Sequence, residues 1–234
     1  MKKYYYIILL ILFFGLLSCS NEETKTQNQV AARPTVPIQN GEVQIGTQVW
    51  TTKNLNVSRF RNGDLIPHVP DASQWAYINY PAWTYYNNIS TNGTVYGKLY
   101  NWYAVNDSRG LAPEGFHVPS DTEWTTLINF LGGASIAGGK MKETGTNHWQ
   151  SPNTGATNEV GFKGLPGGCV FYYDSPGSYQ DVQVVGGWWS STEAVDSVDP
   201  FSIAVCYQLN RSSQNSNRYS HYKRYGYSVR CIKN

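Results

Sequence analysis

The chain has 234 residues and a formal net charge of +2, and its Lys and Arg residues form no cluster. The sequence therefore gives no indication of nucleic acid, or of an anionic membrane surface, as a partner. Its 18 Tyr and 8 Trp, together with many Asn, Ser and Gly, are typical of extracellular binding surfaces and equally of loop-rich folds without a ligand.

The N-terminal segment has the layout of an export signal, because Lys2-Lys3 precede an apolar run over residues 7–17. As a helix this run would be about 16 Å long, too short for a hydrocarbon core of about 30 Å. An ordinary secretory signal or a short membrane anchor would share this layout. However, Leu16-Leu17-Ser18-Cys19 resembles the lipobox of bacterial lipoprotein precursors. The resemblance implies that residues 1–18 are a signal peptide and that Cys19 is lipidated.

Residues 19–42 are expected to form a flexible tether, since the stretch after Cys19 is too polar to bury and its end contains Pro34 and Pro37. The acidic pair Glu22-Glu23 resembles the surface-export signal of Bacteroidota lipoproteins. These features predict an outer-membrane lipoprotein, attached to the membrane through its N-terminal lipid and displayed at the cell surface. Inward-facing display stays open as the alternative.

Residues 43–234 are enough for one domain with a sizeable core. The cysteines that remain in it are Cys169, Cys206 and Cys231, and in an oxidising compartment they could form a disulfide. Pairing of Cys206 with Cys231 is favoured, because both lie in strand-like runs near the end of the chain. Buried reduced thiols at all of these positions are the alternative.

The first part of the domain contains a strand signal followed by an irregular region. Alternation of apolar and polar residues over 43–50 predicts a hairpin or bent strand. Residues 58–94 are rich in Asn, Pro, Asp and Gly, so we expect an irregular region whose aromatic residues pack onto the core. A helical spacing of apolar residues then predicts a short first helix over 96–105.

A second helix has the clearest local signal. Ser120 and Glu123 form a Ser-x-x-Glu capping box at its start, and Gly132-Gly133 ends it. One face of this helix is apolar and contains Trp124, Leu127, Ile128 and Leu131. We therefore expect this face to pack onto the core.

From residue 160 onward the pattern changes to short apolar runs separated by turns, which predicts strands. The runs cover residues 161–165, 187–191, 201–207 and 227–232. Strands at both ends of the domain, with two helices between the first strand and the rest, predict an α+β fold whose terminal strands pair.

Several strings, taken in order, carry a family resemblance. They include Lys53-Asn54-Leu55, Tyr96-Gly97-Lys98-Leu99-Tyr100-Asn101-Trp102, Gly115-Phe116-His117-Val118-Pro119-Ser120, Leu165-Pro166-Gly167-Gly168, Trp188-Trp189-Ser190-Ser191 and Gly226-Tyr227-Ser228-Val229-Arg230-Cys231. Over residues 43–234 the chain resembles the Fibrobacter succinogenes major paralogous domain, found in exported proteins of Fibrobacter and Bacteroidota. The resemblance implies a single C-type lectin-like domain, similar also to the formylglycine-generating enzymes, with two helices packed on short, mostly antiparallel sheets and long loops. It implies no biochemical role.

Enzymatic chemistry finds little support in the sequence. The cysteines do not lie in a recognisable copy of the motif of the formylglycine-generating enzymes, and no nucleophile elbow, phosphate-binding loop or dinucleotide fingerprint occurs. The histidines lack metal-ligand spacing, and His117, beside the start of the second helix, is interpreted as structural. We therefore expect a protein without enzymatic activity and without a cofactor.

A lectin-type calcium site would need about six to eight oxygen ligands, supplied by Glu-Pro-Asn-like and Trp-Asn-Asp-like strings. Pro200 has no flanking Glu and Asn, and Trp189 is followed by Ser190-Ser191. Ca²⁺ therefore has no recognisable motif in this chain. A different site is left open by scattered carboxylates at Asp174, Asp181, Asp196 and Asp199.

Ligand binding is the function class that remains. Segment 171–186 occupies the place of the long upper loop of lectin-like folds, where ligands usually bind. Its candidate ligand-binding residues are aromatic or acidic: Tyr172, Tyr173, Asp174, Tyr179 and Asp181. Aromatic faces beside carboxylates suit a carbohydrate and a protein partner equally well. We expect a non-enzymatic binding module for an extracellular glycan or other ligand, with a structural or adhesive surface scaffold that binds proteins as the alternative.

Overall fold

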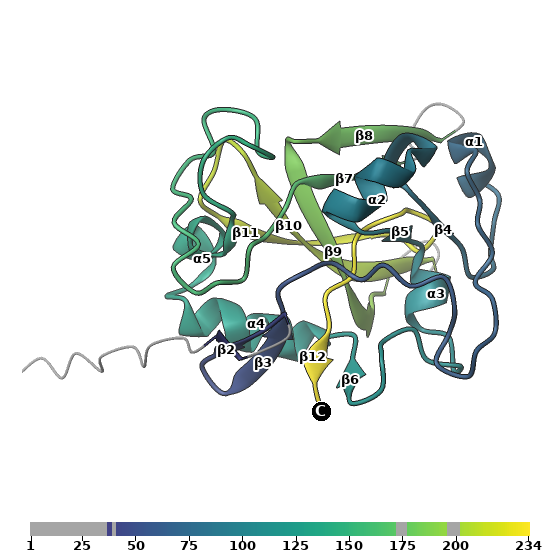
Figure 1. Ribbon diagram of the computed structural model, residues 1–234, viewed down its shortest axis with the longest axis horizontal. Helices are drawn as coiled ribbons and strands as arrows, with labels where there is room; N and C mark the ends of the chain where they lie inside the picture. Colours follow the sequence, from purple (N-terminus) through teal and green to yellow (C-terminus); the bar gives the residue numbers. More distant parts are fainter. Residues whose placement is uncertain (1–36, 39–40, 172–176, 196–201) are drawn as a thin grey trace, which may run out of the picture. The chain divides into compact units, whose positions relative to one another are not determined.

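The computed structural model of the protein describes residues 37–38, 41–171, 177–195 and 202–234, all within one compact unit, Arg33–Asn234 (Figure 1). The predicted signal peptide, Cys19 and most of the tether lie outside the described residues. So do the candidate site residues Tyr172, Tyr173 and Asp174, and the carboxylates Asp196 and Asp199. Within the described ranges, no helix has the length and apolar character needed to cross a membrane.

The two ends of the domain meet in a five-stranded antiparallel sheet of order β1-β2-β3-β12-β6. Its strands are β1 (Pro37–Ile38), β2 (Glu42–Ile45), β3 (Gln48–Thr51), β6 (Phe116–His117) and β12 (Ile232–Lys233). Ile232 lies opposite Trp50 on one side and opposite His117 on the other. The expected pairing of the terminal strands is confirmed. Strand β1, which lies within the segment expected to be a tether, pairs with β2.

A second, three-stranded antiparallel sheet has the order β11-β10-β9. Its strands are β9 (Val185–Glu193), β10 (Ile203–Asn210) and β11 (Ser216–Tyr222). The strands expected over 187–191 and 201–207 are therefore confirmed in type, within the described residues. Strand β11 was not predicted, since its residues are mostly polar and it lies at the edge of the sheet.

Two small two-stranded antiparallel sheets complete the strands within the described ranges. Strand β4 (Trp83–Thr84) pairs with β5 (Leu99–Tyr100), and β7 (Gly167–Phe171) pairs with β8 (Ser178–Val182). The β7–β8 pair corrects the expectation of one long loop after residue 171, because β8 and the start of β9 occupy much of that segment.

The second predicted helix is confirmed as α4 (Asp121–Phe130), which is followed by α5 (Ala134–Met141). Both bonds of the capping box form: Glu123 N–H donates to Ser120 Oγ at 3.3 Å, and Ser120 N–H donates to Glu123 Oε2 at 2.8 Å. The apolar face is buried as expected at Trp124, Leu127, Ile128 and Leu131. Helices α4 and α5 pack against the three-stranded sheet (Figure 1).

The helix predicted over 96–105 is only partly correct. Gly97, with φ +76°, ends helix α2 (Ser90–Tyr96), and strand β5 follows it. Helical structure resumes only in α3 (Trp102–Val105), where Ala104 N–H donates to Asn101 Oδ1 at 3.1 Å. The residues whose apolar spacing predicted a helix therefore form strand β5 and then the single turn of α3. Helix α1 (Ala72–Trp75) and a 3-10 turn (Tyr86–Asn88) lie in the region that was expected to be irregular.

The strand predicted over 161–165 is not formed. Gly161 and Lys163 have φ values of +71° and +53°, which no regular strand accommodates. The expected run over 227–232 is likewise reduced to bridges and the short β12. The overall class is nevertheless α+β, with helices packed on short antiparallel sheets.

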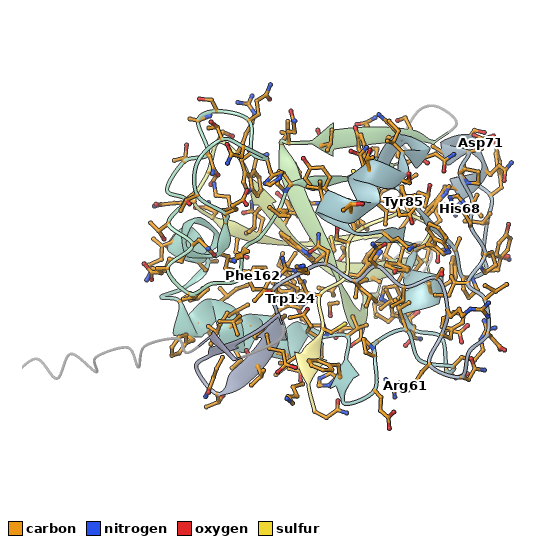
Figure 2. The ribbon with its side chains drawn as sticks, viewed as in Figure 1. Arg61, His68, Asp71, Tyr85, Trp124 and Phe162 are labelled. Carbon is orange, nitrogen blue, oxygen red and sulfur yellow. The ribbon has the colours of Figure 1, made fainter. Side chains whose placement is uncertain are left out.

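The hydrophobic core lies on both faces of the three-stranded sheet, because successive residues of β10 point to opposite sides. Ala204 and Cys206 belong to one buried cluster, and Val205 and Tyr207 to another. In the second cluster the aromatic rings are closely packed: the Trp124 and Tyr207 rings are 5.1 Å apart and nearly parallel. Figure 2 shows Trp124 beside Phe162, with 6.0 Å between the ring centroids.

Cys169, Cys206 and Cys231 are free, buried thiols, so the favoured disulfide between Cys206 and Cys231 is absent. Cys206 lies in the three-stranded sheet opposite Tyr219, whereas Cys231 N–H donates to Thr51 Oγ1 at 3.1 Å beside the five-stranded sheet. Cys206 therefore lies within the three-stranded sheet, whereas Cys231 directly precedes β12 of the five-stranded sheet. Burial raises the pKa of all three thiols, which keeps them protonated and unreactive at neutral pH.

Candidate functional site

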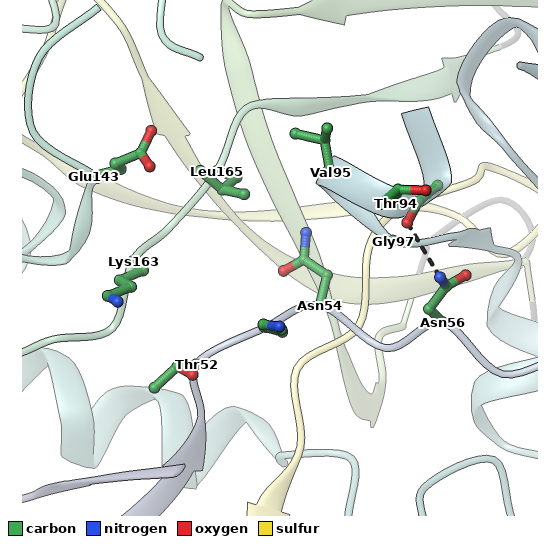
Figure 3. A pocket seen from close by; sticks show the side chains of 11 residues that line it. Thr52, Asn54, Asn56, Thr94, Val95, Gly97, Glu143, Lys163 and Leu165 are labelled. Atoms are coloured by element: carbon green, nitrogen blue, oxygen red, sulfur yellow. Dashed lines mark hydrogen bonds between the residues drawn. The ribbon is translucent and has the colours of Figure 1, made fainter. Parts of the chain in front are cut away.

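An open cavity of about 400 Å³ lies where three distant segments meet (Figure 3). Its walls come from the segment after β3, from α2 with Gly97, and from the loop that contains Lys163 and Leu165; Glu143 lies at one side. Many of its lining groups are polar, and they include hydroxyls, amides, two ammonium groups and one carboxylate.

Asn54 forms the floor of the cavity, and its side chain is held by four hydrogen bonds. Its Oδ1 accepts from Trp188 Nε1–H at 2.8 Å and from Arg230 Nε–H at 2.7 Å. Its Nδ2 donates to the Tyr96 carbonyl at 2.8 Å and to Ser228 Oγ at 3.2 Å. The amide therefore joins residues from four parts of the chain and cannot rotate without breaking these bonds.

Beneath Asn54, Arg230 is completely buried and has no carboxylate among its hydrogen-bond partners. Its guanidinium donates to the carbonyls of Thr51, Phe162 and Lys163 at 2.7, 2.7 and 2.9 Å. Burial lowers the pKa of Arg230 to about 9, which still leaves it charged at neutral pH. Arg230 thus ties the C-terminal segment to β3 and to the cavity wall.

A second wall is built around Asn56 and Gly97. Asn56 Nδ2 donates to the Gly93 carbonyl at 3.1 Å (Figure 3), and buried Lys98 donates to Asn56 Oδ1 at 2.8 Å. The Lys98 ammonium also lies 4.3 Å from the Trp83 ring centroid, a cation–π distance. Gly97 is required here because a Cβ would lie 2.7 Å from the Leu55 carbonyl oxygen.

The rim of the cavity carries Lys53 and Lys163, both exposed. Neither ammonium has a hydrogen-bond or ion-pair partner among the described residues. Glu143, by contrast, is only partly exposed, and its Oε2 lies 2.7 Å from His148 Nδ1. The His148 ring packs edge-on against Tyr96, with 6.0 Å between centroids.

The predicted ligand-binding residues that are described do not line this cavity. Tyr179 and Asp181 lie in β8. The Tyr179 hydroxyl donates to the Pro70 carbonyl at 2.7 Å and lies 2.9 Å from Thr84 Oγ1, so it is held by the protein itself. Asp181 is exposed and has φ +65°. Tyr172, Tyr173 and Asp174 lie outside the described residues.

Sequence reasoning did not find the cavity. The available signal was Arg230, a single charged residue between Val229 and Cys231-Ile232. Buried polar groups need partners, so such residues indicate a shared hydrogen-bond network. The network itself depends on contacts between residues far apart in the sequence, and those contacts are not visible in any one string.

His117 joins helix α4 to the C-terminal residue. Its Nε2 lies 2.7 Å from Glu123 Oε1, and its Nδ1 lies 2.7 Å from Asn234 Oδ1. Both ring nitrogens are therefore occupied, and this arrangement fits a structural role. Among the residues that the structure describes, no group of three or more His, Cys, Asp or Glu side chains could hold a metal ion.

Comparison with known proteins identifies the family. No curated protein and no solved structure matches this chain. The model of the Fibrobacter succinogenes major domain matches residues 43–233, which include every element from β3 to β12 and every residue that lines the cavity. The chain therefore belongs to the Fibrobacter succinogenes major domain family.

Proposed function

We propose that this protein is a lipoprotein, anchored in the outer membrane through Cys19, whose domain binds an extracellular ligand at the cell surface and has no enzymatic activity. A glycan is the ligand class that we favour. The observation that carries the proposal is the cavity above Asn54, which is built from strings that also carry the family resemblance.

The chemistry of the cavity suits a polyhydroxylated ligand. Hydroxyl, amide and ammonium groups converge on a concave surface, where they can donate to and accept from sugar hydroxyls. All four hydrogen-bonding positions of the Asn54 side chain are used within the protein, so Asn54 is a fixed floor and the other polar lining groups are the ones that can bind sugar hydroxyls.

We also propose that the fold is C-type lectin-like. Paired terminal strands, two consecutive helices and a separate three-stranded sheet support this assignment. Under this proposal the β7–β8 hairpin and the residues between its strands correspond to the long upper loop. Tyr172, Tyr173 and Asp174, which lie outside the described residues, stay candidate ligand-binding residues under this proposal.

The alternative is a structural or adhesive scaffold that binds proteins. Strand β11 favours it, because this strand is at a sheet edge and its Tyr219 and Tyr222 are 43% and 41% exposed. An edge strand with exposed aromatic residues can contact another protein through both its backbone and its side chains.

A thermal-shift screen of the full chain in detergent, with a saccharide panel and with Ca²⁺ or EDTA, tests the proposal. A ligand at about 100 times its Kd stabilises by about 2.7 kcal/mol, which raises Tm by about 5–10 °C for a domain of this size. Thr94→Trp should fill the cavity and abolish the shift. Thr91→Trp is the matched control, since Thr91 is exposed in the same helix but does not line the cavity.

A saccharide shift that Thr94→Trp leaves intact would show that the ligand binds elsewhere, and Tyr172→Ala with Tyr173→Ala would then test the upper loop. No shift with any saccharide would contradict glycan binding and favour the scaffold.

A further inference from the structure

Several cationic side chains surround the cavity, and none of them has a carboxylate partner among the residues that the structure describes. They are Lys53 and Lys163 at the rim, and Lys98 and Arg230 beneath it. Lys98 donates only to the oxygens of Asn56, at 2.8 and 3.1 Å, and the partners of Arg230 are an amide oxygen and backbone carbonyls. The two buried cations are thus hydrogen-bonded to neutral groups, and no carboxylate among the described residues offsets their positive charges.

The carboxylate that lines the cavity does not cancel this charge. Glu143 Oε2 lies 2.7 Å from His148 Nδ1, and its single negative charge is outnumbered by the charges of Lys53, Lys163 and the two buried cations. Neither Lys53 nor Lys163 forms an ion pair with it. The cavity therefore keeps a net positive potential, which a concave, low-dielectric surface concentrates.

The two rim lysines differ from the other cations that the structure describes. Ion pairs with carboxylates hold Arg109, Lys140, Arg218, Lys223 and Lys233. Backbone carbonyls accept from Arg59, Arg61, Lys142, Arg211 and Arg224. The ammonium groups of Lys53 and Lys163 have neither kind of partner among the described residues, and both border the same cavity.

The backbone at Lys163 provides an independent observation. Its φ of +53° is a left-handed conformation that favours glycine, yet a lysine occupies it. The conformation is fixed from both sides, because Lys163 N–H donates to Asn158 Oδ1 at 2.8 Å and its carbonyl accepts from Arg230 at 2.9 Å. Strain that the surrounding structure holds at a cavity rim supports a role for the side chain placed there.

We infer that the cavity binds the anionic group of an acidic saccharide, a carboxylate or a sulfate ester, through Lys53 and Lys163. The inference rests on the proposed glycan-binding function and names its ligand class. The two ammonium groups contact the anion directly, and hydroxyl and amide groups such as Thr94 and Asn56 contact the neighbouring sugar hydroxyls. Since the cations belong to the protein, this binding requires no metal ion and persists in EDTA.

Calorimetric titration of the full chain in detergent tests this inference with matched saccharide pairs. Oligogalacturonate is compared with its neutral methyl ester, and a sulfated dextran oligosaccharide with the unsulfated form. We expect at least one acidic member to bind about tenfold more tightly than its neutral counterpart, and Lys53→Gln and Lys163→Gln each to remove about tenfold in affinity. The corresponding arginine variants should retain the binding.

Lys140→Gln is the control, because Lys140 is a partly exposed cation that does not line the cavity. Equal affinity for acidic and neutral members, or equal losses in Lys140→Gln and Lys53→Gln, would overturn the inference and leave the proposed function standing. Absence of binding to every saccharide, acidic and neutral, would overturn both.

Discussion

Replacing Arg230 by methionine should destabilise the domain strongly. Methionine keeps much of the aliphatic length of arginine but has no donor, so the carbonyls of Thr51, Phe162 and Lys163 each lose the bond that the guanidinium supplies. Asn54 Oδ1 still accepts from Trp188. The loss is therefore concentrated on three backbone acceptors.

The magnitude follows from the cost of leaving buried acceptors unsatisfied, about 1–3 kcal/mol each, or about 3–9 kcal/mol for three. Part of this cost is offset because methionine avoids the desolvation of a guanidinium. We expect a net loss of about 3–5 kcal/mol, similar to that for breaking other buried charged contacts. This is a large share of the stability of about 5–15 kcal/mol typical of native proteins, and corresponds to a Tm lower by about 6–20 °C.

Urea unfolding followed by tryptophan fluorescence measures this loss. Arg230→Lys keeps the charge but not the planar set of donors, and should lie between the wild type and Arg230→Met. Arg59→Met is the control, because Arg59 is exposed and makes one backbone bond, to Gly63 at 2.8 Å. If Arg230→Met were as stable as Arg59→Met, the reasoning would be refuted, since apolar packing would then replace the whole network.

Further predictions concern the turns, the helix cap and the response to pH. Gly97→Ala should lower the stability by about 1–3 kcal/mol because of the positive φ, and further because the new Cβ would contact the Leu55 carbonyl. Gly63→Ala, at φ +93° in open space, should lower the stability only by the contribution of the positive φ. Equal losses of stability in the two variants would contradict the steric argument. Ser120→Ala should remove about 1 kcal/mol of cap energy, seen as a Tm lower by about 2–4 °C, whereas an unchanged Tm would refute it. Burial lowers the pKa of His221 below 6.5, so the unfolded chain binds more protons in that window and stability falls as pH decreases below 6.5. Chemical denaturation between pH 7 and 5.5 checks this, because the fall should be smaller in His221→Gln.

The parts of the fold that sequence reasoning predicted correctly depend on local chemistry. The cap of α4 is formed by Ser120 and Glu123, and the apolar face of that helix follows from the helical spacing of its apolar residues. The pairing of the strands at the two ends of the domain could be predicted, because both ends have a strand-like alternation of apolar and polar residues. In these cases neighbouring residues alone determine the element.

The parts that failed depend on distant residues. Lys163 is left-handed because Asn158 and Arg230 bind its backbone, so the apolar run around it could not become a strand. The candidate ligand-binding site stays a prediction, because Tyr172, Tyr173 and Asp174 lie outside the described residues. Tyr179 looked available in the sequence, but its hydroxyl is bound by a carbonyl more than a hundred residues earlier. The cavity could not be anticipated, since its walls come from segments that meet only in the folded domain.

The position of β12 has a consequence for how the chain folds. This strand is made of nearly the last residues, yet it lies between β3 and β6 in the interior of its sheet. Contacts between residues so distant in sequence slow folding, because the loop entropy is lost before the contacts form. The five-stranded sheet therefore cannot form completely until β12 has been synthesised. A stop codon at position 230 would remove a central strand together with Arg230, and would leave the aromatic core exposed to aggregation.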